Sequence, residues 1–551
     1  MIPNYKYRLV YKTDGKTVTT GRASTDDVNV TFAKTEDTLR CVIAPKAPLE
    51  IIKFEVSFPQ TFAADSRVFP NGYQSWTDSM EYFPDQRMRE ITPRTLKMLK
   101  LFPMTRLGVD RSGDTYFHKF PDKAGVFYGF SYLYVRNGGA LTLYGSLSER
   151  SGYTIITADA NNGKITVSKD LAGKTYTEPT ELLSLAVVTG DYDAAFDRWF
   201  ALMDVACRAN RRLTGYTTWY NYYGNITGDI VKRDLDALAA ADVKTDIFQI
   251  DDGYQTAVGD WLSTDKKKFP AGMQAAAESI HAKGMLAGLW LAPFGAVPRA
   301  EVYKRHKDWF VRDKNGNIPK VGPNWGGFCA LDIYNEAVRA HLRHVFDVVL
   351  NDWGYDLVKL DFLYAAACFP MYNKTRGEIM CDAMELLREC CGDKLILGCG
   401  VPLMPAFGKA DYCRIGADIS LDWKLTRFIR ECVSTHHAVN NTIFRRGLDG
   451  RAFGNDPDVF LLRDNNIKMT AAQRELLTKI NSLFGSLVFT SDNVGDYGER
   501  QRQIFQRAVD RSDVKILSAD YDRTGDITVT YTENGERQSF TFDPVNGLLR
   551  D

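Results

Sequence analysis

Between residues 215 and 491 the chain alternates short apolar runs with longer segments of helical periodicity, and this alternation limits its fold more than any other feature. Short apolar runs suit buried strands, whereas apolar residues three and four positions apart suit one face of a helix. Eight such units are typical of a (β/α)8 barrel. The eight strands are expected at 215–219, 246–251, 286–294, 357–363, 395–399, 412–418, 458–462 and 487–491, the seventh being the weakest.

Helix boundaries within this region are well marked. Helices are expected at 271–283, before Gly284, and at 335–353, before Gly354, because glycine commonly ends a helix. Thr470-Ala-Ala-Gln473 has the pattern of a capping box at the start of another helix. A doubly wound parallel sheet is the alternative fold, but it usually carries a Gly-rich phosphate loop, which the sequence lacks.

The two ends of the chain have a different pattern. Residues 1–195 contain short alternating runs separated by turn residues, as in an antiparallel sandwich, and alternation returns in the last segment. We therefore predict a multidomain α/β plus β protein. Its parts are an N-terminal antiparallel β-sandwich (1–195), a central catalytic (β/α)8 TIM barrel (196–505) and a small C-terminal antiparallel β-domain (506–551).

Composition excludes some classes of partner. The chain has 69 basic and 69 acidic residues, so it lacks the basic excess that nucleic acids and anionic membranes require. Its N-terminus shows no signal-peptide pattern, and no apolar run approaches the length of a membrane span. Ten cysteines without CxxC pairs fit reduced thiols in a cytoplasmic protein. We expect no nucleic-acid or membrane partner, and a monomer or small homo-oligomer.

Two acidic residues stand beside cations at predicted strand ends, where a (β/α)8 barrel places its active site. Asp361 follows Lys359, and Asp418 follows Arg414. One carboxylate to attack and one carboxylic acid to protonate the leaving group are what sugar cleavage needs. Lys359 is expected to keep Asp361 ionised, since a nearby cation lowers a carboxyl pKa. Asp418 is the candidate acid/base, with Arg414 facing the substrate or Asp361 instead.

Other polar and aromatic residues at strand ends suit a sugar ligand. Asp251 and Asp252 are acceptors for sugar hydroxyls, and Trp290, Trp219 and Trp325 are candidate stacking platforms or, equally, core residues. The sequence contains no HExxH and no G-x-S-x-G pattern. We predict no metal and no cofactor.

Seven motifs, in this order along most of the chain, resemble glycoside hydrolase family 36, the α-galactosidases of clan D. They are Asn71-Gly-Tyr-Gln-Ser-Trp76, Gly215-Tyr-Thr-Thr-Trp-Tyr220, Phe248-Gln-Ile-Asp-Asp-Gly-Tyr254 with Gly259-Asp-Trp261, Leu289-Trp-Leu-Ala-Pro-Phe294, Lys359-Leu-Asp-Phe-Leu363, Leu397-Gly-Cys-Gly400 and Arg414-Ile-Gly-Ala-Asp418. Tyr216 and Ala417 depart from the family pattern, where Trp and Pro are common.

The resemblance implies a retaining double displacement on terminal α-linked galactose of oligosaccharides, and it implies a role for each matching residue. These are Asp361 as nucleophile, Asp418 as acid/base, Asp251 and Asp252 on the 4- and 6-hydroxyls, Lys359 and Arg414 as cations near the sugar, Trp290 as pocket wall, Cys399 and Gly400 on the C2 side, and Trp76 reaching over the barrel mouth.

Three alternatives remain open. An α-N-acetylgalactosaminidase needs room for an acetamido group, which the Cys399-Gly400 wall disfavours. A galactosyl-transferring enzyme differs only in its acceptor. A non-catalytic sugar-binding protein has no need for both Asp361 and Asp418.

Overall fold

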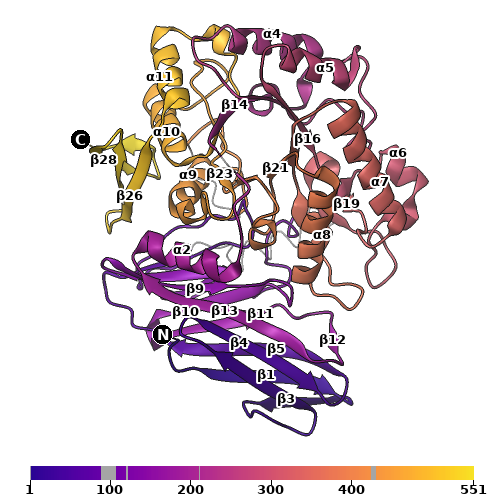
Figure 1. Ribbon diagram of the computed structural model, residues 1–551, viewed down its shortest axis with the longest axis vertical. Helices are drawn as coiled ribbons and strands as arrows, with labels where there is room; N and C mark the ends of the chain where they lie inside the picture. Colours follow the sequence, from indigo (N-terminus) through magenta and orange to yellow (C-terminus); the bar gives the residue numbers. More distant parts are fainter. Residues whose placement is uncertain (1, 89–106, 120–121, 210, 424–429, 551) are drawn as a thin grey trace.

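The structure, a computed structural model, describes residues 2–88, 107–119, 122–209, 211–423 and 430–550 of the 551-residue chain. Two antiparallel sheets form the lower part of Figure 1, a parallel barrel lies above them, and a small antiparallel sheet lies at the side near the C-terminus. The N-terminal sandwich, the TIM-like barrel and the C-terminal β-domain are thus confirmed as folds. The residue boundaries 1–195, 196–505 and 506–551 stay a prediction.

The N-terminal sheets pack face to face across a shared apolar core. Alternate residues of β5 are buried, and Phe58 of β5 contacts Tyr144 of β9 in the other sheet, with ring centroids 5.8 Å apart. One sheet has the order β2-β1-β5-β11-β10-β7 with β12 on β5, and the other β3-β4-β13-β9-β8-β6. Their bounds are β1 (Lys6–Thr13), β2 (Lys16–Thr20), β3 (Val28–Lys34), β4 (Thr38–Pro45), β5 (Leu49–Pro59), β6 (Arg67–Pro70), β7 (Val126–Phe130), β8 (Tyr132–Asn137), β9 (Ala140–Ser146), β10 (Thr154–Asp159), β11 (Lys164–Lys169), β12 (Thr175–Tyr176) and β13 (Thr180–Gly190).

The parallel sheet has the order β23-β22-β21-β20-β16-β15-β14-β25-β24. Its strands are buried along their whole length except at the first residues of β16 and β21, as expected when both faces of a parallel sheet are covered. The predicted strand positions are confirmed, but most of the strands end before the predicted residue. Their bounds are β14 (Leu213–Thr217), β15 (Ile247–Ile250), β16 (Leu286–Leu291), β20 (Leu357–Leu360), β21 (Leu395–Gly398), β22 (Tyr412–Arg414), β23 (Gly454–Asp456), β24 (Val459–Phe460) and β25 (Leu487–Thr490).

The seventh barrel strand is interrupted. β23 pairs with β22 and β24 pairs with β25, and only Pro457 and Asp458 separate the two pieces. Asp458 has a φ of +78°, a left-handed conformation that breaks the strand. Because the two edges of the sheet belong to one interrupted strand, the sheet closes into a barrel.

Helices cover the outside of the barrel (Figure 1). The helix that begins after Asn335 continues through a π-turn (Val348–Asp352) before Gly354, and the capping box at Thr470 is present. The connection after β21 differs from the predicted strand–helix unit, since a 3-10 turn at Met404–Ala406, containing Pro405, takes the place of a helix. The main helices are α4 (Gly228–Ala239), α5 (Gly272–His281), α7 (Glu336–Asp347), α8 (Arg376–Cys391), α9 (Thr435–Phe444), α10 (Ala471–Phe484) and α11 (Glu499–Asp510).

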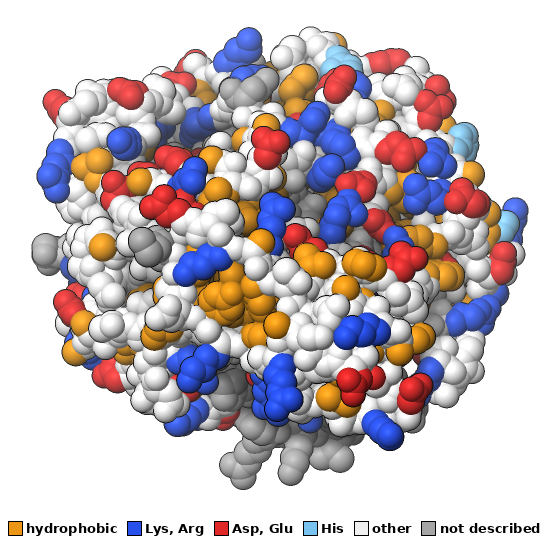
Figure 2. All heavy atoms as spheres, turned by 60° about the horizontal axis from the view of Figure 1, so that its bottom comes forward, with side chains coloured by type: hydrophobic (Ala, Val, Ile, Leu, Met, Phe, Trp, Pro, Cys, Tyr) orange, Lys and Arg blue, Asp and Glu red, His pale blue; other side chains and the backbone are white. Residues whose placement is uncertain are grey.

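The C-terminal sheet packs beside α10 and α11 (Figure 1). It is antiparallel, in the order β26 (Val514–Tyr521), β27 (Ile527–Glu533), β28 (Glu536–Asp543) and β29 (Leu548–Leu549). The face drawn in Figure 2 carries basic and acidic side chains interspersed, in keeping with their equal totals. Within the described ranges we find no helix with the length and apolarity of a bilayer span.

Helix α2 and Arg445 are among the features that join the sandwich to the barrel. Helix α2 (Tyr192–Met203) lies between them, with Trp199 donating to the Ser146 carbonyl of β9 at 2.9 Å. Arg445, which is fully buried, donates to Asn71 Oδ1 at 2.9 Å and to the Ser75 carbonyl at 2.6 Å on the sandwich side. It also donates to the Ile415 carbonyl, just beyond β22, at 2.7 Å. The loop after β6 is therefore held against the barrel mouth.

Candidate active site

A cavity of about 260 Å³ opens at the carboxyl ends of the barrel strands. This volume is near the lower end of the range for small-ligand pockets, which begins at roughly 300 Å³. Nine of the predicted site residues line it, namely Trp76, Trp219, Asp251, Asp252, Trp290, Trp325, Lys359, Asp361 and Asp418. Side chains from both the sandwich and the barrel thus meet in one pocket.

Asp361 lies one residue beyond β20, where the chain leaves the sheet. Trp290 donates its indole N–H to Asp361 Oδ2 at 3.1 Å, and the Phe362 amide donates to Oδ1 at 2.8 Å. Phe362 has a φ of +54°, a strained conformation of the kind that clusters at functional sites. Burial raises the pKa of the Asp361 carboxyl, and Lys359 and the Trp290 hydrogen bond only partly oppose this.

Lys359 has a different partner from the expected one. Its Nζ lies 2.8 Å from Asp251 Oδ2, and both side chains are almost fully buried. The Gln249 amide also donates to Asp251 Oδ2, at 2.8 Å. Burial disfavours the charged lysine, but the neighbouring Asp251 carboxylate keeps the pKa of Lys359 above its usual value. Lys359 does lower the pKa of Asp361, as predicted, but burial of the carboxyl raises it by more. That Asp361 is ionised stays a prediction.

Asp252 is held by donors on both oxygens. Trp325 donates its indole N–H to Oδ2 at 2.8 Å, and the Gln255 amide donates to Oδ1 at 2.5 Å. Trp325 itself has a φ of +56°, so its indole is held in the pocket by a strained loop. Burial raises the pKa of Asp252. Of the two interpretations of Trp325, the structure favours a place in the pocket over the core.

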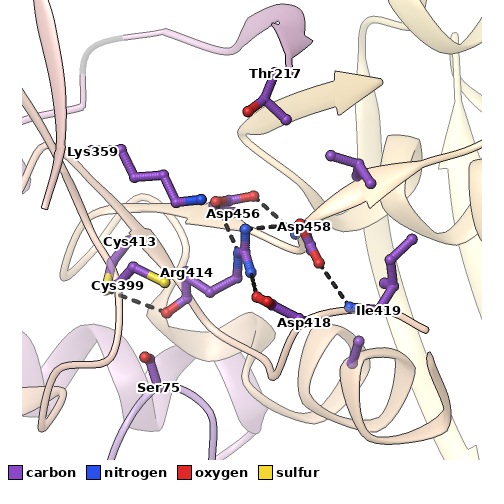
Figure 3. Close-up of polar contacts among 12 residues, drawn as sticks. Ser75, Thr217, Lys359, Cys399, Cys413, Arg414, Asp418, Ile419, Asp456 and Asp458 are labelled. Carbon is purple, nitrogen blue, oxygen red and sulfur yellow. Dashed lines mark hydrogen bonds and ion pairs between the residues drawn. The ribbon is translucent and has the colours of Figure 1, made fainter. Parts of the chain in front are cut away.

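Asp418 lies four residues beyond the end of β22 rather than on the strand. Arg414 Nη1 donates to Asp418 Oδ1 at 2.8 Å (Figure 3). The same guanidinium contacts Asp456 Oδ2 at 3.1 Å and Asp458 Oδ1 at 2.8 Å. The expectation that Arg414 faces the substrate or Asp361 is therefore wrong, because three carboxylates around the buried guanidinium hold it on the Asp418 side.

Trp76 brings the sandwich into the pocket wall. Its indole N–H points to Cys399 Sγ at 3.3 Å, just after β21. A side chain at Gly400 would meet the Trp76 ring at 2.8 Å, and Gly400 has a φ of +57°, so glycine is required here. Cys399 and Gly400 support this wall from behind, and burial raises the pKa of the Cys399 thiol.

Several other lining residues carry no signal in the sequence. Glu431 is the most informative, because it adds a further carboxyl to the pocket. Thr77 donates to Glu431 Oε1 at 2.8 Å, and burial, with Asp114 nearby, raises the pKa of Glu431 to about 7. Glu431 follows no predicted strand and belongs to no motif, so only the folded chain reveals its place. The described residues contain no cluster of three or more His, Cys, Asp or Glu side chains suited to a metal ion.

Comparison with known proteins places this pocket in a family. A model of the melibiase family matches residues 212–374, a stretch that contains Asp251, Asp252, Trp290, Lys359 and Asp361. The α-galactosidase TtGalA from Thermus thermophilus, solved with stachyose, superposes with a TM-score of 0.70 at 25% identity over 92% of this chain and 100% of that one. Residues 212–374, which hold most of the pocket carboxylates, thus match the melibiase family. The predicted resemblance to clan D α-galactosidases is thereby confirmed.

Two curated relatives match over shorter stretches of the chain. An A type blood α-D-galactosamine galactosaminidase from Flavonifractor plautii is 27% identical over 269 residues, or 45% of this chain and 24% of that protein. The bifunctional α-galactosidase/sucrose kinase AgaSK from Mediterraneibacter gnavus is 26% identical over 246 residues, 41% of this chain and 25% of that protein. The matched stretches thus span about a quarter of these curated relatives.

Proposed function

We propose that the protein is a retaining exo-α-galactosidase that removes terminal galactose from oligosaccharides. The observation that carries this proposal is the meeting of Asp361 and Asp418, from two different strand ends, in one small pocket with Asp251 and Asp252. A pocket of about 260 Å³ suits one terminal sugar unit rather than an internal stretch of chain.

The proposed reaction has two displacements. Asp361 attacks the anomeric carbon while Asp418 gives its proton to the departing glycosidic oxygen, so the glycosidic bond breaks as a glycosyl–Asp361 ester forms. Asp418 then takes a proton from water, whose oxygen displaces Asp361 from the anomeric carbon. Asp251 and Asp252 accept hydrogen bonds from sugar hydroxyls, and Lys359 holds Asp251 in place.

The test uses p-nitrophenyl α-galactoside and raffinose with the wild type, Asp361→Ala and Asp418→Ala. Both variants are expected to lose roughly 10²-fold or more in kcat, the usual scale for a positioned acid or base. Added azide is expected to rescue Asp361→Ala with β-galactosyl azide as product, and wild-type product is expected to appear first as α-galactose by NMR. Asp393→Asn, whose carboxyl is fully exposed, is the control. No hydrolysis by the wild type, or β-galactose as first product, would contradict the proposal.

A second candidate is cleavage of α-linked galactosamine or N-acetylgalactosamine, and the Flavonifractor plautii relative motivates it. The Trp76 ring against Gly400 disfavours a larger group at this wall. The p-nitrophenyl α-glycosides of the two amino sugars, assayed beside the galactoside, decide between the candidates by their kcat/KM.

A further inference from the structure

The break in the seventh strand places a buried carboxyl beside Asp418. Asp458 adopts its left-handed conformation between β23 and β24, and its side chain is fully buried. A non-glycine residue in this conformation is strained, and strained residues cluster at functional sites. The contacts of the Asp458 carboxylate indicate its role.

Asp458 binds the segment that carries Asp418 at both of its ends. Oδ1 lies 2.8 Å from Arg414 Nη2, and Arg414 in turn donates to Asp418 (Figure 3). Oδ2 accepts the backbone N–H of Ile419, the residue after Asp418, at 2.8 Å. Tyr220 donates its hydroxyl to the same Oδ2, which fixes the carboxylate from the opposite side.

We propose that Asp458 is the positioning residue for the acid/base carboxyl of Asp418. The inference rests on the proposed function. Asp418 is about one-third exposed and lies beyond its strand, so the strand itself does not fix the carboxyl. Asp458 does so through two contacts, one to the guanidinium that touches the Asp418 carboxylate and one to the adjacent backbone.

If Asp458 has this role, its removal should lower kcat/KM by a factor that depends on the leaving group. A p-nitrophenolate departs without a proton, whereas methanol needs one from Asp418. In Asp458→Ala, kcat/KM for methyl α-galactoside is expected to fall roughly 10²-fold, and that for p-nitrophenyl α-galactoside less than about 10-fold. Azide is expected to speed turnover of the p-nitrophenyl substrate by this variant, as for Asp418→Ala.

Asp449→Ala is the matched control. Asp449 precedes β23 and accepts from the backbone N–H of Asn455 at 2.7 Å and from the Ser486 hydroxyl at 3.0 Å. It therefore supports the same strand away from Asp418. This variant is expected to affect both substrates equally. If Asp458→Ala does not fold, Asp458→Asn takes its place, since it keeps an acceptor for the Ile419 N–H. This variant is also expected to lose more kcat/KM on the methyl than on the p-nitrophenyl substrate, by a smaller factor.

Equal loss on both substrates in the Asp458 variants, with no azide effect, would overturn this role and leave the proposed function standing. A wild type inactive on every α-galactoside would overturn both. A leaving-group-dependent loss shared by Asp418→Ala and Asp458→Ala but absent from Asp449→Ala would support the role.

Discussion

Lys359 Nζ lies 2.8 Å from Asp251 Oδ2, so the cation of the fourth barrel strand pairs with the acid that follows the second strand. Asp361, two residues after Lys359, is held instead by the N–H donors of Trp290 and Phe362. The nucleophile candidate therefore takes its hydrogen bonds from neutral donors. Lys359 forms its ion pair with Asp251 and also lowers the pKa of the Asp361 carboxyl.

Lys359→Met is expected to destabilise the protein by about 3–5 kcal/mol, because it leaves the buried Asp251 carboxylate without its cation. Urea unfolding followed by tryptophan fluorescence measures this. The double variant Lys359→Met/Asp251→Asn should recover part of the loss. Lys394→Met, which removes a partly exposed contact to Asp356, should cost less than about 1 kcal/mol. A similar cost for the two single variants would contradict the prediction.

Trp290→Phe is expected to move the acid limb of kcat/KM to higher pH. The indole N–H stabilises the ionised form of Asp361, so its removal raises the pKa of this carboxyl further. A hydrogen bond to a charged group contributes about 1.5–3 kcal/mol, so the loss of this bond should be measurable. Trp261→Phe is the control for packing, because the Trp261 ring packs on Trp290 with ring centroids 5.7 Å apart. An acid limb that stays in place in Trp290→Phe would refute this account.

Arg445→Met is expected to cost about 3 kcal/mol or more, because it leaves the buried Ser75 and Ile415 carbonyls and the Asn71 amide oxygen without their donor. We also expect a higher KM, since these contacts hold the loop that carries Trp76. Thermal unfolding and steady-state kinetics measure the two effects. Arg446→Met, which removes a cation from the face of Tyr192, is the control. An unchanged KM would contradict the prediction that the Arg445 contacts affect substrate binding.

Glu431→Gln is expected to change how stability depends on pH. The folded pKa of Glu431 is raised from 4.5 to about 7, so the folded state keeps a proton that the unfolded state releases. The wild type therefore loses stability from this group as pH rises from about 4.5 to about 7. Calorimetry should find the variant gaining Tm relative to the wild type over this range. For Glu499→Gln, at the exposed start of α11, the difference in Tm from the wild type should not change with pH over this range.

Local patterns predicted the barrel well, because buried strands and amphipathic helices each depend on their own residues. The ends of strands were less predictable. The sequence pattern predicts a strand as far as Asp418, but β22 ends at Arg414. Contacts of Arg414 with Asp456 and Asp458 shape the loop beyond it. Lys359 and Asp251 are 108 residues apart, so their pairing depends on closure of the barrel.

Site residues that belong to a motif were placed in or beside the pocket. Glu431 and Arg445 belong to none of the motifs, and both contact residues of the other part of the molecule, Thr77 and Ser75. Such residues carry no periodicity, since the contacts that bury them come from elsewhere in the chain. The oligomeric state, the cytoplasmic location and the domain boundaries stay predictions.

The wall formed by Trp76 against Gly400 and Cys399 has a consequence for engineering. Neither the β-sandwich nor the barrel supplies the whole pocket. A barrel expressed without its β-sandwich is therefore expected to retain Asp361 and Asp418 but to lose the pocket wall that Trp76 forms. We expect chimaeras that exchange the N-terminal β-sandwich between relatives to alter sugar selectivity while Asp361 and Asp418 stay unchanged.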